Sequence, residues 1–427
     1  MKKVKKEKKK SKVILKVLGV IAAFFAVVIV LTALLDASAR DKNIEHAKSF
    51  ETVQIENQLV PTKDENGYWT FTTDEEFKVM QLTDVHIGGG YLSKEKDAMA
   101  LNAVAAMVMA EKPDLVIATG DIAYPVPFSS GSFNNLSGAR IFASLMEQLG
   151  VYWVITYGNH DTEMYSYYDR AAISDFYENS GFKYCLFQSG PEDIDGYGNS
   201  VINVKNSKGV ITQAFVLMDT HSYTDGDYFG AMWKYDGVHE NQIEWYRETI
   251  TKLNAYNQKV TGDEKAVAKS TAFLHIPPTE YLDAWCEYVD NDFKDTENVK
   301  YFYGLAGESK KVVYCSTYEE NLFETMLELD STKGIFCGHD HFNNFSVEYK
   351  GIRLTYGKSI DYLAYVGIHK VGTQRGCTMI TYSPDGTFTC KPESYYQDKY
   401  VSQYEKEEVT MQDIVNQQEI PAEYRNQ

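Results

Sequence analysis

Several features are missing from this 427-residue sequence, and their absence narrows the class of protein. Its six cysteines form no CxxC pair and no zinc-finger spacing, so the sequence indicates no zinc finger. The chain also shows no internal repeat. Hydrophobic residues make up 44% and aromatic residues 14% of the chain, which excludes a disordered or collagen-like protein and allows a sizeable core.

Positive charge is scarce outside the N-terminus. Residues 1–16 hold nine lysines and one glutamate, a net charge of +8 in a chain whose total is −18, so the remaining residues carry −26. Binding to a nucleic-acid backbone depends on lysine and arginine that displace counterions. We therefore expect no nucleic-acid binding.

A single long hydrophobic run stands next to the lysines. Residues 17–35 contain no charged side chain, and 19 residues are about the length of a helix that spans a bilayer. The lysines predict a cytoplasmic N-terminus, with the rest of the chain outside the cytoplasm. The small residues at 37–39 also fit a signal peptide cleaved after Ala39, which would release a secreted protein. The run is longer than the usual signal core of about 7–15 residues, which favours a retained anchor in the cell membrane.

These features divide the chain into five predicted parts. The parts are a basic cytoplasmic tip (1–16), a transmembrane helix or signal (17–35), a polar stalk (36–65), a main folded domain (66–395) and a charged C-terminal tail (396–427).

The domain reads as an α/β fold. Apolar runs at 77–82, 114–119 and 151–157 predict buried strands, and residues 93–112 and 139–149 between them predict helices. Continuous apolar strands that alternate with helices indicate a parallel sheet covered on both faces. Three more apolar runs follow at 213–219, 270–276 and 333–338. After residue 342 the pattern changes to hairpins, one of which turns at Lys350-Gly351.

Polar side chains follow five of the predicted strands at the point where each strand ends. They are Asp84 and His86 in VMQLTDVH, Asp121 in LVIATGD, Asn159 and His160 in VITYGNHD, His275 in TAFLHIPP, and His339 and His341 in GIFCGHDH. The carboxyl ends of strands form the ligand crevice of open α/β sheets, so these side chains can converge. Glycines precede three of the sets, where the backbone has to approach closely.

This set of donors suits two transition-metal ions. Imidazole and carboxylate groups bind manganese, iron or zinc, and an asparagine carbonyl can complete such a site. Asp121 is the natural bridge, because one carboxylate can contact both ions. Two ions about 3.5–4 Å apart can hold a phosphoryl group and lower the pKa of a shared water.

The five motifs, in this order, resemble those of calcineurin-like metallophosphoesterases over about residues 75–395. The segments FLHIPPTEY, YDGVHENQIEWY and GHDHFNNF are most similar to the Dcr2-like and purple-acid-phosphatase-like branch. The resemblance implies a four-layer β-sandwich flanked by helices. It also implies two ions, one held by Asp84, His86, Asp121 and His341, and one held by Asp121, Asn159, His275 and His339. His160 would lie beside the phosphate as a general acid or transition-state stabiliser.

The implied activity is hydrolysis of a phosphomonoester or phosphodiester outside the cytoplasm, by in-line attack of a hydroxide held by the metals. The alternative is a catalytically silent envelope-binding protein on the same fold. Purple phosphatases use a tyrosine three residues after the bridging aspartate. Tyr124 has this position, but His86 is available as a ligand, so we expect that Tyr124 does not bind metal.

Other residues near the motifs have open or structural readings. Asp161 either caps a helix or orients His160, and Lys358 is a possible counter-charge for phosphate. Glu308 is either a substrate-side residue or part of an exposed turn, and we favour the turn. Three histidines outside the motifs, His221, His239 and His369, are expected to be structural; for His221, which follows another strand, the alternative is a place in the cleft.

Overall fold

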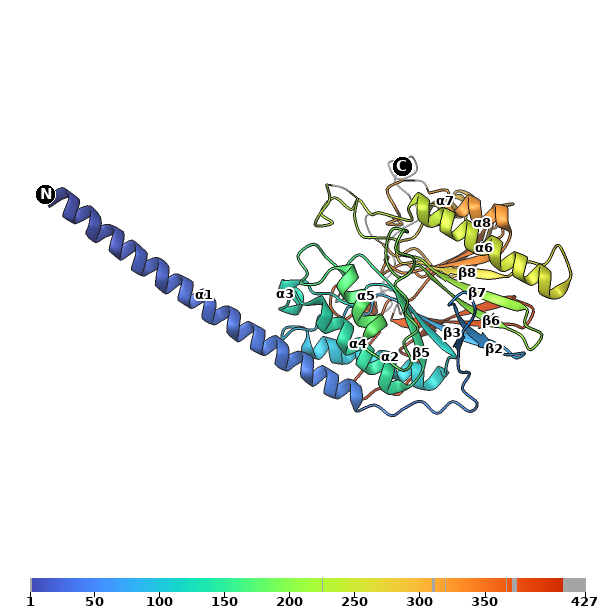
Figure 1. The fold of residues 1–427 in the computed structure, drawn as a ribbon, viewed down its shortest axis with the longest axis horizontal. Coiled ribbons are helices and arrows are strands. Elements are labelled where there is room, and N and C mark those ends of the chain that lie inside the picture. The colour runs from blue at the N-terminus through green and yellow to red at the C-terminus, as the bar shows by residue number, and fades with distance from the viewer. Residues whose placement is uncertain are drawn as a thin grey trace.

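The computed structural model describes residues 2–224, 226–308, 312–318, 320–365, 367–370 and 375–409, with side chains from residue 15 onward. Two β-sheets lie face to face between groups of helices (Figure 1). The five-stranded sheet has the order β14-β13-β3-β4-β5, with β3 (Phe77–Leu82), β4 (Leu115–Thr119), β5 (Tyr152–Thr156), β13 (Gly376–Tyr382) and β14 (Phe388–Ser394). The nine-stranded sheet has the order β1-β2-β6-β7-β8-β10-β12-β11-β9, with β1 (Thr62–Lys63), β2 (Trp69–Thr72), β6 (Ser200–Lys205), β7 (Ile211–Leu217), β8 (Ser270–Phe273), β9 (Val299–Tyr303), β10 (Thr332–Cys337), β11 (Ser346–Tyr349) and β12 (Ile352–Tyr356).

The described helices lie outside the space between the two sheets (Figure 1). They are α1 (Lys2–Lys48), α2 (Lys94–Glu111), α3 (Pro127–Ser130), α4 (Asn135–Leu149), α5 (Arg170–Asn179), α6 (Glu240–Thr261), α7 (Glu280–Asp290) and α8 (Leu322–Leu329), with a 3-10 turn at Ile368–Lys370. Helices α2 and α4 lie on the five-stranded sheet, and α6, α7 and α8 lie on the nine-stranded sheet (Figure 1). The expected four-layer sandwich is confirmed.

The alternation of side chains along β7 shows why two separate cores form. Phe215 and Leu217 point into the core between the sheets. The ring of Phe215 stacks there on that of Phe77, with 5.7 Å between the ring centroids. Ala214 and Val216 point the opposite way and pack under the helices. Successive residues of a strand face opposite sides, so an apolar run without alternation indicates a strand buried on both faces.

The sheets differ from the expected single parallel sheet, because both are mixed. Strands β3, β4 and β5 run parallel, as do β7, β8, β10 and β12. Antiparallel strands extend each group, including the predicted hairpin of β11 and β12. Its turn residues Lys350 and Gly351 both have positive φ, at 48° and 89°, as a type I′ turn requires. The second sheet, and not a second layer of helices, covers the inner face of each parallel group.

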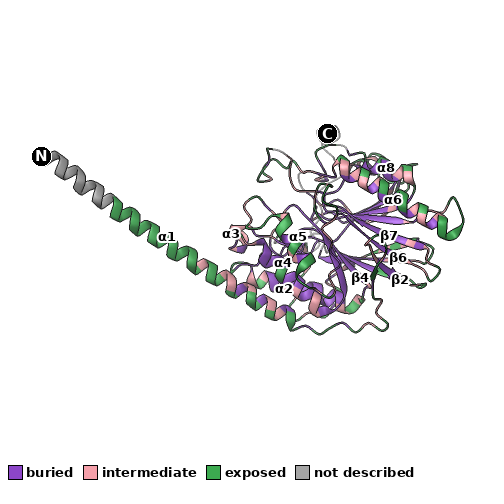
Figure 2. Cartoon of the chain, in the orientation of Figure 1, coloured by how far each residue is buried: buried purple, intermediate pink, exposed green. Residues whose placement is uncertain are grey.

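Residues 36–48, the first part of the segment expected as a stalk, belong to helix α1. Helix α1 continues unbroken through residue 48, and its last turns pack on α4 and α2. Figure 2 shows that the part of α1 after the grey N-terminal turns is exposed, and that buried and intermediate positions appear where the helix reaches the domain. Ala39 and Ala47 are buried there, and the Asn43 amide donates to the Lys94 carbonyl oxygen at 3.2 Å. The sequence did not predict this packing because the segment is mostly polar. Its few small residues allow the helices to pack closely.

The apolar part of α1 is exposed. Residues 15–48 form a helix long and apolar enough to cross a membrane, with a mean hydropathy of 3.0 over its best 18 residues, none of them buried. The predicted tail begins on the domain, since the buried Tyr400 donates from its hydroxyl to Glu111 at 2.6 Å. Residues 410–427 of the tail lie outside the described residues.

Candidate metal centre

The two sheets each supply half of one cluster of polar side chains. Asp84, His86, Asp121, Asn159 and His160 follow β3, β4 and β5 of the five-stranded sheet. His275 follows β8, and His339 and His341 follow β10, of the nine-stranded sheet. The sheets are joined at this edge by a bridge between Thr83 and Ser359 and by the Gln81 amide, which donates to the Cys337 carbonyl oxygen at 3.0 Å. The cluster therefore lies on the seam of the sandwich.

Asp121 is at the centre of the cluster. Its Oδ2 lies 3.3 Å from Nε2 of His86 and 3.3 Å from Nε2 of His275, so one oxygen faces an imidazole on each side. Its Oδ1 accepts a hydrogen bond from the backbone N–H of His160 at 2.8 Å, which fixes the carboxylate.

Four buried residues form the tighter half of the cluster. Asp84, His86, Asp121 and His341 each place one ligand atom within 4.8 Å of the other three. Oδ1 of Asp84 lies 3.4 Å from Nε2 of His341 and 4.0 Å from Nε2 of His86. These are the four residues expected at the first ion, and the structure brings all of them together.

The other half is more open. His275 Nε2 lies 3.1 Å from Oδ1 of Asn159, and the His275 Nδ1–H donates to the Thr119 carbonyl oxygen at 2.8 Å. His339 stands farther out, with its ring centroid 5.2 Å from that of His275. The buried Nε2 of His339 has no hydrogen-bond partner among the described residues. A buried ring nitrogen without a partner is the kind of group that a cation satisfies.

The backbone is strained where it carries these residues. Asp84, His86, Asp121 and His339 have positive φ angles of 49°, 53°, 52° and 77°. Residues other than glycine seldom adopt this conformation, and it concentrates at functional sites. The strain turns side chains of adjacent strands toward one point.

Glycine is required directly next to the cluster. A Cβ atom on Gly158 would lie 2.1 Å from Oδ1 of Asp121, and one on Gly338 would lie 1.8 Å from Oγ1 of Thr83. The expected close approach of the backbone at these glycines is thus observed.

Asp361 was not found from the sequence, yet it supports both imidazoles of the tighter half. Its Oδ2 lies 3.0 Å from Nδ1 of His341, and its Oδ1 lies 3.5 Å from Nδ1 of His86. Asp361 follows β12 outside any motif, so only its position after a strand could have indicated it. Carboxylates in this position fix the ring orientation and tautomer of a metal-binding histidine.

His160 is held by a second residue that the sequence did not indicate. Its Nδ1 lies 2.6 Å from Oε1 of Glu163, which also accepts from the Tyr223 hydroxyl at 3.2 Å.

Asp161 has neither of the two roles left open for it. Its carboxylate accepts from the backbone N–H groups of Asp121, Ala123 and Gly158 at 2.8–3.0 Å, and so ties the ends of β4 and β5 together.

The electrostatics of the cluster show a demand for positive charge. Burial lowers the pKa of His275, but Asp121 outweighs burial and raises it to about 9. Burial likewise lowers the pKa of His341, and Asp84 and Asp361 raise it to about 9. The carboxylates thus hold protons on imidazoles that would normally be neutral at pH 7. Divalent ions bound to the same atoms would replace these protons, so the residues present fit a metal centre.

A cavity of about 260 Å³ opens onto the cluster. It is lined by Asp121, His160, Trp233, Tyr235, Glu308, Tyr314, His339, Asp340, His341 and Tyr365. Glu308 is therefore not in an exposed turn: it is buried, and its Oε1 accepts from the Phe342 N–H at 3.0 Å. Lys358 is buried and is not among the lining residues.

Tyr124 stacks on the His86 ring with 4.6 Å between centroids and 12° between planes.

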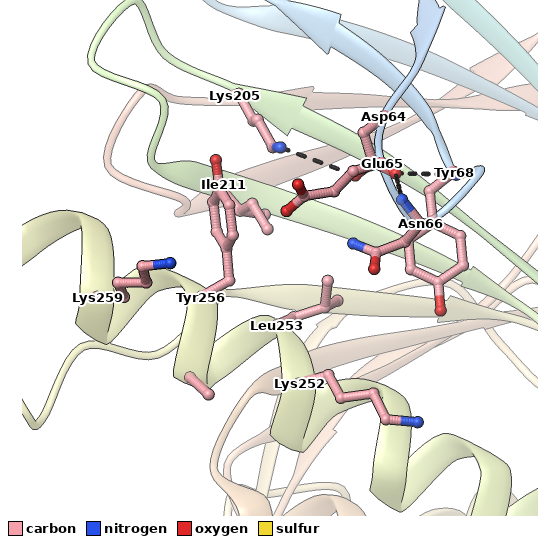
Figure 3. Close-up of a pocket in the computed structure, with 11 residues that line it drawn as sticks. Asp64, Glu65, Asn66, Tyr68, Lys205, Ile211, Lys252, Leu253, Tyr256 and Lys259 are labelled. Atoms are coloured by element: carbon pink, nitrogen blue, oxygen red, sulfur yellow. Dashed lines mark hydrogen bonds and ion pairs between the residues drawn. The ribbon is translucent and has the colours of Figure 1, made fainter.

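A separate cavity of about 290 Å³ lies at the other end of the nine-stranded sheet, beside α6 (Figure 3). Its walls include Asp64, Lys205, Lys252 and Lys259, and Nζ of Lys205 lies 3.7 Å from Oδ2 of Asp64. No histidine or cysteine is among its described lining residues, so it lacks the donors of a transition-metal centre.

A helix-flanked β-sandwich with buried imidazoles and carboxylates on its seam is typical of metal-dependent hydrolases. The model of the calcineurin-like phosphoesterase family matches residues 77–343, and the chain belongs to this family.

Relatives by sequence include two kinds of phosphatase. The chain is 29% identical over 322 residues to "Probable inactive purple acid phosphatase 14" of Arabidopsis thaliana, across 69% of this chain and 73% of that protein. It is 28% identical over 294 residues to "Phosphatase DCR2" of Saccharomyces cerevisiae, across 64% of this chain and 45% of that protein. Among solved structures, a dimetal phosphatase from Danio rerio aligns with a TM-score of 0.47 at 12% identity, across 76% of this chain and 98% of that one.

The contacts of Asp361 lead to a prediction about metal affinity. Asp361→Asn keeps the shape but removes the negative charge beside Nδ1 of His86 and of His341, so metal binding should weaken about 10–100-fold. Equilibrium dialysis against Mn²⁺ measures this change. Asp385→Asn, in an exposed turn, is the matched control and should bind Mn²⁺ like the parent. An unchanged affinity for Asp361→Asn would show that Asp361 does not support the ligands.

Proposed function

We propose that this protein is a metal-dependent phosphoesterase that hydrolyses a phosphomonoester or phosphodiester. The observation that carries the proposal is the position of Asp121, which lines a cavity. One of its oxygens, Oδ2, lies 3.3 Å from Nε2 of His86 and 3.3 Å from Nε2 of His275. A carboxylate so placed can bridge two ions in contact with one phosphate group.

Two sets of donors would share this bridge. Asp84, His86, Asp121 and His341 would hold the first divalent ion, and Asp121, Asn159, His275 and His339 would hold the second. Imidazole with carboxylate and amide oxygen suits manganese, iron or zinc. When bound, such a pair of ions neutralises phosphoryl oxygens and lowers the pKa of water.

His160 is assigned as the general acid. Glu163 holds its Nδ1, and the ring lines the cavity, so Nε2 is the atom left to donate a proton to the leaving oxygen. Burial lowers the pKa of His160, but Asp121 and Glu163 outweigh burial and raise it. The raised pKa favours the protonated imidazole, which is the form that a general acid needs.

The cavity walls suggest the rest of the substrate. Trp233, Tyr235, Tyr314 and Tyr365 face the cavity, and no lysine or arginine is among its described lining residues. The negative phosphate would be balanced by the metal ions and the His160 imidazolium, and the alcohol part would pack on aromatic rings. An ester with a flat or apolar alcohol group fits these walls better than a highly charged one.

A catalytically silent envelope-binding protein is the second candidate. This candidate is favoured by the name of the Arabidopsis relative, which calls that protein probably inactive. The seven donor residues are all present in this chain, which supports the enzyme.

A phosphate-release assay separates the two candidates. The full-length protein in detergent, loaded with Mn²⁺, should release phosphate or alcohol from at least one member of a panel of aryl and alkyl phosphomonoesters and diesters. Asp121→Asn should be inactive, because it weakens both ion sites. A protein that binds two ions and hydrolyses no member of the panel would support the silent candidate.

The adjacent residues Asn159 and His160 should respond differently to substitution. His160→Ala should retain the metal and lose rate by about 10²–10⁴-fold, the usual contribution of a general acid. The loss should shrink for nitrophenyl esters, because a weakly basic leaving group needs little protonation. Asn159→Ala should lower occupancy of the second ion, and added Mn²⁺ should partly restore activity. Elemental analysis and rates for both variants check the assignment, and the reverse pattern would contradict it.

We further propose that the apolar part of α1 anchors the protein in a membrane, with the N-terminus in the cytoplasm and the domain outside. The exposed apolar helix and the lysines before it support this topology. Secretion after cleavage at Ala39 is less favourable, because α1 runs through that residue, and Ala39 is buried against the domain.

A protease added to intact cells tests the topology. It should degrade the catalytic domain and spare an epitope placed at the N-terminus. Protection of the whole chain would contradict the proposal, and a mature protein that starts at Arg40 would show a cleaved signal instead of an anchor.

A further inference from the structure

A second group of metal-ligating side chains lies apart from the centre described above. His221 follows β7, Asp236 lies in the loop before α6, and His239 is the residue that precedes α6. One ligand atom from each lies within 4.8 Å of the other two. All three are partly exposed, so an ion can reach them from solvent.

The orientation of Gln242 fixes the tautomer of His221. The Gln242 Nε2 group donates to the Asp219 carbonyl oxygen at 2.8 Å and to Asn199 Oδ1 at 2.9 Å, so its Oε1 has to be an acceptor. That oxygen lies 3.0 Å from Nε2 of His221, which therefore carries the proton. In the neutral ring, Nδ1 of His221 is then left with a free lone pair.

His239 is held in a similar way. Its Nδ1 lies 2.8 Å from Oδ2 of Asp195, and its Nε2 lies 3.3 Å from Oδ1 of Asp236. The Asp195 contact places a proton on Nδ1 and directs Nε2 toward Asp236. The Asp236 Oδ1 atom also accepts from the Gly237 N–H at 3.0 Å and from the Tyr318 hydroxyl, which fixes this carboxylate.

This pattern matches the surroundings of metal-binding histidines. Such histidines nearly always donate the second ring N–H to a carboxylate or carbonyl oxygen, as His239 and His221 do here. Two imidazoles and one carboxylate are also the donors of tetrahedral zinc sites that leave one position for water. We propose that His221, Asp236 and His239 bind one zinc ion, independently of the Asp121 centre.

The distances require a small closure on binding. Ligand atoms at about 2.0–2.2 Å from a tetrahedral zinc ion lie roughly 3.3–3.6 Å apart. The pair of His239 and Asp236 already meets this separation at 3.3 Å. The rings of His221 and His239 are stacked with 4.0 Å between centroids and 18° between planes, so the rings have to rotate. The His239 side chain is 34% exposed and has room to do so.

The ion would fasten a segment that forms part of the cavity wall. Within the described part of residues 221–239, the Tyr223 hydroxyl accepts from the Asn159 amide at 3.0 Å. The ring of Tyr235 packs edge-on against His339 with 4.2 Å between centroids. Zinc held at both ends of this segment would therefore fix two tyrosines that contact the metal centre. Between them, Tyr228 and Phe229 are 60% and 65% exposed.

Zinc stoichiometry tests the proposal on the full-length protein in detergent. After dialysis against Zn²⁺ alone, the variant with both His221→Ala and His239→Ala should hold one zinc ion fewer than the parent, whatever the parent's total. His369→Ala, a histidine outside both groups, should hold as much zinc as the parent. Equal zinc in the parent and the double variant would overturn the proposal. Because the comparison is a difference, it stands even if the Asp121 centre proves inactive.

A second variant protects the test against misfolding. Asp195→Asn removes no ligand and changes a half-exposed side chain, yet it should weaken binding of this one ion about 10–100-fold. Chymotrypsin gives an independent readout, because cleavage at Tyr228 and Phe229 should slow when Zn²⁺ is added to the parent. The double variant should show no such protection. Cleavage that Zn²⁺ does not change in the parent, or zinc affinity unchanged by Asp195→Asn, would count against the site.

Discussion

The edge of the sandwich that carries the candidate metal centre depends on three buried carboxylates that lie against a shared group of imidazoles. Asp84, Asp121 and Asp361 are almost fully buried, and each contacts imidazoles instead of lysine or arginine in the interactions described above. Carboxylates in a region of low dielectric demand positive charge at short range. Without ions, the imidazoles meet this demand with protons, and divalent ions meet it better. Metal binding and the stability of this edge are therefore linked, because the same ions that hold substrate would also relieve repulsion inside the fold.

The sandwich is the means by which these groups meet. One sheet supplies Asp84 and Asp121, and the other supplies His341 and Asp361. Neither sheet alone holds a complete donor set for even one ion. The left-handed backbone at Asp84, His86 and Asp121 lies beside the points where the sheets are joined, the Thr83–Ser359 bridge and the hydrogen bond from Gln81 to Cys337. A change that lets the sheets slide should therefore disturb the metal centre before it unfolds either core.

The main strands, and the seven candidate donor residues at their ends, could be predicted from the sequence because a strand end is a local signal. A buried apolar run followed by a glycine and an imidazole or carboxylate can be recognised without the fold. Asp361 was not predicted because its partner His341 lies 20 residues away in the sequence. Glu163 was not predicted because its role depends on its contact with the ring of His160, which the sequence does not show. The docking of residues 36–48 was also missed, since a few small residues within a polar stretch carry no periodic signal. Glu308 looked like a turn because its burial comes from the loop around Phe342, far along the chain.

The continuity of α1 has a mechanical consequence. A flexible tether would let the domain take many orientations above a bilayer. A helix that continues without a break from its apolar part onto the domain instead fixes the distance between the domain and the bilayer. At 1.5 Å per residue, the polar part from residue 36 to residue 48 is only about 20 Å long. With residues 17–35 in a membrane, the mouth of the cavity would keep one height and one tilt relative to the lipid surface. Geometry would then select substrates by their distance from the membrane as well as by their chemistry.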